Sequence, residues 1–299
     1  GVIGGASLGA FAGTVGVEHM LLGAAGFAAM FSAPLAGIVF AVEEMGRALE
    51  EKISSPVLTA IIFAGITAYA FLNSYIFFED ASLVMPWDHT WLAVPLCGIV
   101  GGFFGALFSR TLIAGERLLN RNGLPTVAIA ILSGLIIAIL GYASGGDTYG
   151  TGFQNTQAIL TGHEAIDPLY PFLKMLATCA TFFSGIPSGI FVPALATGAG
   201  LGLDLAHWFP VAPITAMILL TMTGYFAGML QSPITAFVIV MEMTDTHEIL
   251  IPLMATAFLA SGTSRVICPI PLYRALCDAY TKENDSEPPA TSRTELNET

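Results

Sequence analysis

Charged side chains are scarce in this chain, and their scarcity excludes an ordinary soluble domain. Only 11% of the 299 residues are Asp, Glu, Lys or Arg, while 55% are apolar. Soluble domains contain about 25% charged residues, which cover the surface that faces water. The segments 124–143 and 175–203 contain no charged residue. Each is long enough to cross the hydrocarbon core of a bilayer, about 30 Å thick. The sequence therefore predicts a multi-pass membrane protein.

Residues that bind metals or form disulfides are also few and unsuitably spaced. The four cysteines show no CxxC spacing and lie mostly within apolar segments, so we expect them to pack in the core; they are Cys97, Cys179, Cys268 and Cys277. The five histidines are scattered without ligand spacing. The sequence predicts no metal and no cofactor. The net charge of −12 does not indicate a nucleic-acid partner, because much of it lies in loops and in the polar tail after Lys282.

Two apparent enzyme motifs lack the context that their chemistry needs. Residues 5–9 match the GxSxG pattern of serine hydrolases, but no strand precedes them and no His/Asp pair accompanies Ser7. The alternating glycines at 198–202 lack the GxGxxG spacing of a dinucleotide site. Small residues in membrane helices indicate close packing, which we also expect at Gly98, Gly101, Gly102 and Gly105. We predict that the protein is not an enzyme; the alternative, an intramembrane hydrolase at Ser7, would react with a serine-directed probe.

Hydropathy and helix breakers predict an all-α, polytopic fold. Segments such as 34–48 and 233–243 are too short to span a bilayer alone, as happens where membrane helices break to build a site. The expected helices cover residues 4–14, 19–31, 34–48, 54–78, 90–121, 124–143, 168–184, 192–208, 213–229, 233–243, 247–264 and 271–283.

An internal repeat supports a two-part architecture. Pro34 recurs as Pro233 and Glu43 recurs as Glu242, in both cases 199 residues later and within similar apolar sequence. Duplicated halves with broken helices are typical of transporters whose site lies between inverted repeats. We therefore expect a remnant of the first repeat, the second repeat, a final helix and a polar, disordered tail; their predicted bounds are 1–78, 90–264, 265–283 and 284–299.

The segment 184–193 contains two prolines and two glycines, which predict a break in a membrane helix. Pro193 suits the first turn of a new helix. The backbone amides of Ile190 and Phe191 would then lie at the helix start without intrahelical partners. An anion satisfies such amides and meets the positive end of the helix dipole. A structural kink whose amides are satisfied by neighbouring helices remains the alternative.

Two adjacent carboxylates end the segment 34–48. Glu43 can pair with Arg47 at i+4 and have a structural role only. Glu44 then faces another direction, since a helix turns about 100° per residue. A carboxylate at the edge of hydrocarbon is suited to carry a proton, although a solvated pair at a helix end is the alternative. Glu242 repeats Glu43, so we expect it to anchor a short helix end.

Five segments, collinear over about residues 3 to 280, resemble signatures of the CLC family of chloride channels and transporters. Residues 189–193 (GIFVP) resemble the GxFxP motif of that family. The other four are APLAG at 33–37 followed by EEM at 43–45, YGTGF at 149–153, EMTD at 242–245 and PLY at 271–273.

The resemblance implies a central chloride ion bound by the amides of Ile190 and Phe191, next to Gly189, and by the Tyr273 hydroxyl, which is a neutral donor. Glu44 matches the intracellular proton-transfer glutamate of the family, which favours proton-coupled chloride antiport. A passive chloride channel, or a transporter of another small anion such as nitrate or fluoride, is the alternative. The resemblance also implies a homodimer with one pore per subunit, for which apolar faces in 34–78 and 233–264 are suited.

The chain also departs from the family pattern. The GREGP-like gate motif and the GSGIP-like serine motif are missing from the first half, and the repeat spacing places them just upstream of Gly1. We therefore expect an N-terminally truncated sequence, which by itself should not transport. Basic residues flank segments on one side, which predicts that this side is cytoplasmic; they are Arg47, Lys52, Arg110, Arg117 and Arg121. Without the cytoplasmic nucleotide-binding modules of eukaryotic relatives, we expect a bacterial inner-membrane location.

Overall fold

The computed structural model describes residues 17–31, 33–45, 55–72, 85, 88–122, 125–162, 166–186, 188–245 and 247–276. These residues form helices joined by turns, with no strand among them, which confirms the all-α prediction. The expected helix 4–14, the motif around Ser7 and the tail 284–299 lie outside the described residues.

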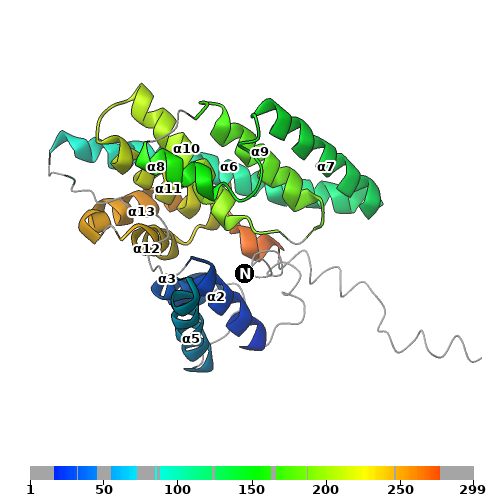
Figure 1. Ribbon diagram of the computed structural model, residues 1–299, viewed down its shortest axis with the longest axis horizontal. Coiled ribbons are helices and arrows are strands. Elements are labelled where there is room, and N and C mark those ends of the chain that lie inside the picture. Colours follow the sequence, from blue (N-terminus) through cyan, green and yellow to red (C-terminus); the bar gives the residue numbers. More distant parts are fainter. Residues whose placement is uncertain are drawn as a thin grey trace, which may run out of the picture.

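Figure 1 shows the arrangement of the helices. In chain order they are α2 (Val17–Phe31), α3 (Pro34–Phe40), the π-helical turn η3 (Ala41–Met45), α5 (Ser55–Leu72), the 3₁₀ turn η4 (His89–Leu92), α6 (Ala93–Asn122), α7 (Thr126–Ala143), α8 (Phe153–Thr161), α9 (Tyr170–Phe183), α10 (Phe191–Trp208), α11 (Ile214–Leu230), α12 (Pro233–Thr244), the 3₁₀ turn η5 (His247–Ile249) and α13 (Leu250–Ile267).

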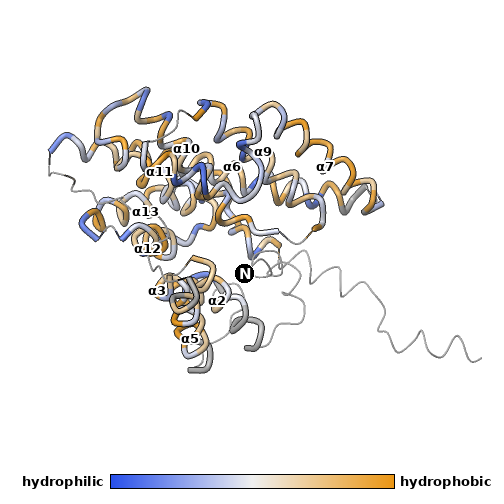
Figure 2. The backbone as a smooth tube through the Cα atoms, in the orientation of Figure 1, coloured by the Kyte–Doolittle hydropathy of each residue, from blue (hydrophilic) through white to orange (hydrophobic). Residues whose placement is uncertain are grey.

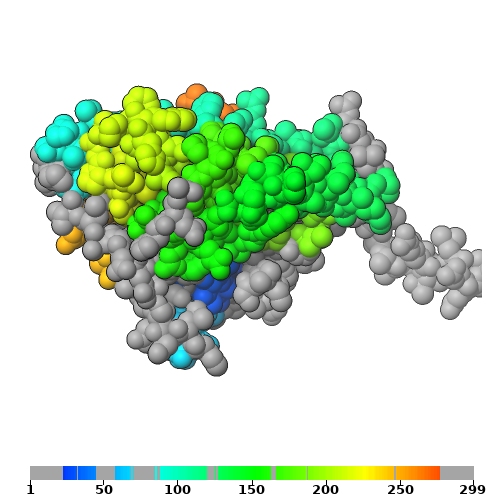
Figure 3. All heavy atoms as spheres, turned by 45° about the horizontal axis from the view of Figure 1, so that its top comes forward, coloured from blue at the N-terminus to red at the C-terminus, as the bar shows by residue number. Residues whose placement is uncertain are grey.

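The surface of the protein is apolar over long stretches. Two helical stretches among the described residues, His89–Leu119 and His247–Leu276, are long and apolar enough to cross a membrane. The apolar side chains of α7 point outward, with Val127 and Ile131 71% and 68% exposed. Figure 2 shows α7 as a largely hydrophobic rod, and Figure 3 shows it on the flank of the molecule. Such a helix is suited to contact lipid rather than water.

Two sets of helices correspond to each other across the predicted repeat. Residues 34–45, which form α3 and η3, correspond to 233–244 of α12 at the offset of 199 residues. At the same offset α2 corresponds to α11, and α5 to α13 within a few residues. Both α3 and α12 begin with a proline in the first turn, where its missing N–H is not needed. Figure 1 shows α3 beside α12.

Glycines bring three long helices into backbone contact. A Cβ atom built on Gly102 of α6 would lie 2.6 Å from the Ala260 carbonyl oxygen of α13. One built on Gly105 would lie 2.2 Å from the Tyr225 carbonyl oxygen of α11. The expected close packing at these glycines is therefore confirmed, and it places α6, α11 and α13 in one tightly packed core.

The helices differ from the sequence-based expectation most clearly at α8 and at the end of α13. Helix α8 forms at 153–161, where we expected no helix, because its many polar residues mask the helical spacing of its few apolar ones. It is bounded by Gly152 and Gly162, both with positive φ, a conformation that glycine adopts without strain. Helix α13 continues to Ile267 rather than ending at 264.

Candidate functional site

The break between α9 and α10 runs from the exposed residues Gly185 and Ile186 to the buried residue Ile190. After α9 ends at Phe183, the Ser184 hydroxyl donates to the Thr181 carbonyl (2.6 Å) and accepts from the Ile186 amide (3.2 Å). Gly185 adopts a φ of 73° and turns the chain away from the helix axis. Helix α10 then begins at Phe191, whose side chain is 2% exposed. The start of a helix is therefore buried here.

The backbone amides of Ile190 and Phe191, at the start of α10, have no hydrogen-bond acceptor among the described residues. The first backbone hydrogen bond of the turn runs from the Ala194 amide to the Ile190 carbonyl (3.0 Å). In the described part of the chain, no carbonyl or side chain accepts a hydrogen bond from the Ile190 or Phe191 amide. A Cβ atom built on Gly189 meets no described atom within 4 Å. The alternative of a kink sealed by neighbouring helices thus finds no acceptor among the described residues.

Tyr273 lies beside this helix start. Its ring centroid is 6.0 Å from that of Phe191 and 6.5 Å from that of Phe40, and its side chain is 5% exposed. The Phe191 ring also contacts Phe27 of α2 (5.3 Å) and Phe226 of α11 (5.7 Å). Phe27 and Phe226 are equivalent positions of the repeat, so helices from both halves hold Phe191. The structure thus brings three of the predicted anion ligands, Ile190, Phe191 and Tyr273, into one buried region.

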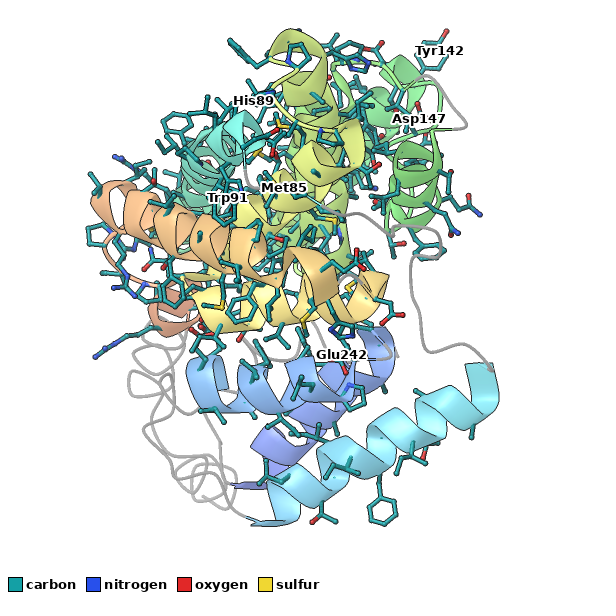
Figure 4. The ribbon with its side chains drawn as sticks, turned by 90° about the vertical axis from the view of Figure 1, so that its left-hand side faces the viewer. Met85, His89, Trp91, Tyr142, Asp147 and Glu242 are labelled. Carbon is teal, nitrogen blue, oxygen red and sulfur yellow. The ribbon has the colours of Figure 1, made fainter. Side chains whose placement is uncertain are left out.

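Glu43 and Glu242 form reciprocal hydrogen bonds between α3 and α12. Glu43 binds the first turn of α12, and Glu242 binds the first turn of α3. The Glu43 carboxylate accepts from the Ile234 and Thr235 amides of α12 (3.1 and 2.7 Å). The Glu242 carboxylate accepts from the Leu35 and Ala36 amides of α3 (3.1 and 2.8 Å). Figure 4 shows Glu242 at the boundary between α12 and α3. These bonds satisfy amides that have no intrahelical partner and place negative charge at positive helix ends.

Glu44 faces the same segment of α12 as Glu43. Its side chain is 2% exposed, and its Oε2 atom accepts a hydrogen bond from the Ser232 hydroxyl. We expected the two carboxylates to face different directions; from the π-helical turn η3 both reach residues 232–235. Arg47, the expected partner of Glu43, lies outside the described residues.

A buried lysine that the sequence analysis did not single out lies elsewhere. Lys174 of α9 is 1% exposed, and its Nζ donates to the Thr148 and Gly150 carbonyls, at 2.9 Å each. It therefore holds the glycine-rich turn between α7 and α8. Ser232, the hydroxyl partner of Glu44, was also missed, because only the folded structure brings residues 188 positions apart together.

Comparison with known proteins identifies the family. The family described as "Voltage gated chloride channel" matches residues 5–265. The chain belongs to the CLC family. This membership confirms the resemblance drawn from the sequence motifs, and CLC proteins are membrane proteins with an all-α fold, as predicted.

The CLC relatives are longer than this chain. An H⁺/Cl⁻ exchange transporter, ClcA of Yersinia pestis bv. Antiqua (strain Angola), is 31% identical over 279 residues, which cover 87% of this chain and 58% of the relative. ClcA of Cronobacter sakazakii (strain ATCC BAA-894) is 30% identical over 287 residues, which cover 90% of this chain and 61% of the relative. The chain thus spans about three fifths of these curated relatives, which are named as transporters rather than enzymes.

Solved CLC structures share the fold. A slow cyanobacterial Cl⁻/H⁺ antiporter gives a TM-score of 0.70 at 23% identity, over 90% of this chain and 66% of that chain. A CLC-type fluoride/proton antiporter gives a TM-score of 0.69 at 24% identity, over 84% of this chain and 64% of that chain. These likenesses establish the CLC fold of the described helices.

Proposed function

We propose that this CLC chain takes part in proton-coupled chloride antiport. The observation that carries the proposal is the buried start of α10, where the Ile190 and Phe191 amides lie open beside Tyr273. The curated relatives named as H⁺/Cl⁻ exchange transporters support the same reaction.

The chloride ion binds to neutral donors. The amides of Ile190 and Phe191 and the Tyr273 hydroxyl point partial positive charge at the anion without a fixed cation. The space beside Gly189 lets the ion approach the helix start. Because Lys174 is occupied by carbonyls, it adds no direct ion pair. Weak, fast-exchanging binding follows, as transport requires.

The proton travels by way of Glu44. Its burial supports this role, because a carboxylate removed from water binds a proton more readily than one in solution. Glu43 and Glu242 have structural roles, since their oxygens are engaged by helix-start amides.

The functional protein is a homodimer in a bacterial inner membrane, with residues 1–78 and 90–264 acting as the two repeats. Apolar side chains on α5 and α13 support a dimer interface: Ile62, Phe63 and Ile66 are 45–65% exposed, and Ile251 and Phe258 are 53% and 51% exposed. Faces of this kind are suited to a partner subunit or to lipid. Cysteines introduced at Phe63 or Phe258 distinguish a partner subunit from lipid: in a membrane preparation they should form cross-linked dimers if the face contacts a partner subunit, and none if it contacts lipid.

The decisive experiment uses the full-length protein, reconstituted in liposomes with opposed chloride and proton gradients. An antiporter gives a reversal potential that depends on the proton gradient. Glu44→Gln should abolish chloride-driven proton uptake and leave chloride flux. A reversal potential that ignores the proton gradient in the unsubstituted protein would instead indicate a passive channel, and intact coupling in Glu44→Gln would refute the role of Glu44.

A further inference from the structure

Ser232 lies at the N-cap of a helix but does not cap it with its side chain. It is the N-cap residue of α12 and is fully buried. A serine at this position commonly accepts a hydrogen bond from the second or third amide of its own helix. Here its side chain makes no such bond, because Glu43 already bonds the amides of Ile234 and Thr235, which are those two residues.

The Ser232 hydroxyl donates to Glu44 instead. The position of the serine is fixed from its other side: Gln231 adopts a φ of 59°, and its Nε2 donates to the Cys268 carbonyl and to the Ser264 hydroxyl (3.2 Å). Ser264 in turn donates to the Gly228 carbonyl of α11 (2.6 Å). The donor that faces Glu44 is therefore held by α11 and by the end of α13.

The repeat shows that the fold does not need this pair. At the offset of 199 residues, Ser232 corresponds to Ala33 and Glu44 to Met243. Both counterparts are apolar and fully buried, although Glu242 caps α3 in the same way that Glu43 caps α12. The helix-capping frame thus forms equally well without a hydroxyl or a second carboxylate at these positions.

Other titratable residues lie on the elements that pack around Glu44. Elements in contact with η3 include α2, α3 and, through these hydrogen bonds, α12. Glu43 and Glu242 accept from helix-start amides, and Glu18 and His19 in the first turn of α2 are the other titratable residues of these elements. The hydrogen bond that Ser232 donates to Glu44 is able to favour one protonation state of this carboxylate over the other.

We infer that Ser232 is a positioning residue for proton transfer: its hydroxyl orients the Glu44 carboxylate and sets the pH range in which that carboxylate exchanges protons. The inference rests on the proposed function, because it assigns Ser232 a role through Glu44. A hydrogen bond donated to a carboxylate favours the charged form. Loss of the hydroxyl should therefore let Glu44 keep its proton at higher pH.

The test measures chloride-driven proton uptake against internal pH in liposomes that contain the full-length protein. Ser232→Ala should move the pH of half-maximal uptake upward by about one unit, the scale of one hydrogen bond to a charged group. Alanine fits the frame, since Ala33 occupies the equivalent position. Ser232→Thr, which keeps a hydroxyl, should restore the original profile, and Ala33→Ser should leave it unchanged.

A double substitution separates the inference from a general effect on the fold. If Ser232 acts through Glu44, chloride flux in Ser232→Ala/Glu44→Gln should equal that in Glu44→Gln alone. An unshifted profile in Ser232→Ala, or a further loss of flux in the double variant, would overturn the inference. Proton uptake that persists in Glu44→Gln would overturn the proposed function itself, whereas uncoupling by Glu44→Gln with an unshifted Ser232→Ala profile overturns the role of Ser232 alone.

Discussion

Glu43 and Glu242 are equivalent residues of the two repeats. The Glu43 carboxylate, which follows α3, caps the first turn of α12, and the Glu242 carboxylate, near the end of α12, caps the first turn of α3. The helices α3 and α12 must therefore lie antiparallel, related by a two-fold axis perpendicular to both. This exchange joins the two halves next to the predicted proton carrier Glu44, so the same contact that holds the fold together also positions the site.

Removal of either capping carboxylate should destabilise the protein. Glu43→Ala and Glu242→Ala each leave two helix-start amides without their acceptor, which costs about 1–3 kcal/mol. Glu242 is 7% exposed, less than Glu43, so its loss should cost at least as much. Thermal unfolding in detergent measures the effect. Glu248→Ala, at an exposed position, is the control, and equal melting temperatures for all three variants would contradict the capping role.

The close approach of α6 and α13 should not tolerate a methyl group. Gly102→Ala would place Cβ against the Ala260 backbone, which cannot move like a flexible side chain. Overpacking of this kind costs about 1–3 kcal/mol. The matched control is Gly134→Ala on α7, where a Cβ meets no described atom within 4 Å and alanine is the better helix former. Melting temperatures in detergent should fall for Gly102→Ala only; a fall for both would argue against the close contact as the cause.

The Tyr273 hydroxyl should contribute to anion affinity. Tyr273→Phe removes one neutral donor and keeps the ring that packs on Phe191. A net loss of about 1 kcal/mol corresponds to roughly five-fold weaker halide binding, and Tyr273→Ala should weaken binding further. Isothermal calorimetry with chloride measures both. Tyr225→Phe, which removes a buried hydroxyl close to Thr197 of α10, should leave the affinity unchanged; unchanged affinity in Tyr273→Phe and Tyr273→Ala would count against the tyrosine as a ligand.

The open space beside Gly189, at the start of α10, should affect halide binding and leave the stability of the fold unchanged. Gly189 has neither a positive φ nor a close neighbour among the described residues, so Gly189→Ala should leave the melting temperature near that of the unsubstituted protein. The new methyl group would occupy the approach to the Ile190 and Phe191 amides, and halide affinity and flux should fall together. Lower stability with unchanged affinity would show that the glycine serves packing instead.

The sequence predicted the features that depend on local composition. The helix break at 184–193 followed from its prolines and glycines, and the equivalence of Pro34 with Pro233 indicated the repeat that the helix bounds now display. The convergence of Tyr273 on Phe191 came from family resemblance, since no spacing in the chain places a residue near 273 beside one near 191.

Contacts between distant segments could not be predicted in this way. The helical period suggested a pairing of Glu43 with Arg47, whereas the described bonds of Glu43 go to amides almost 200 residues away. Only the antiparallel packing of α3 and α12 creates that geometry. The same holds for Ser232, whose sequence position is that of an ordinary N-cap serine. In the structure, Glu43 instead accepts the hydrogen bonds of the helix-start amides that such a serine would bind.

The central claim is that the amides at the buried start of α10 bind a halide, and anomalous diffraction from crystals grown in bromide tests it most directly. We predict an anomalous peak within hydrogen-bonding reach of the Ile190 and Phe191 amides and the Tyr273 hydroxyl. Density without a peak there, with both amides bonded to protein carbonyls, would contradict the account.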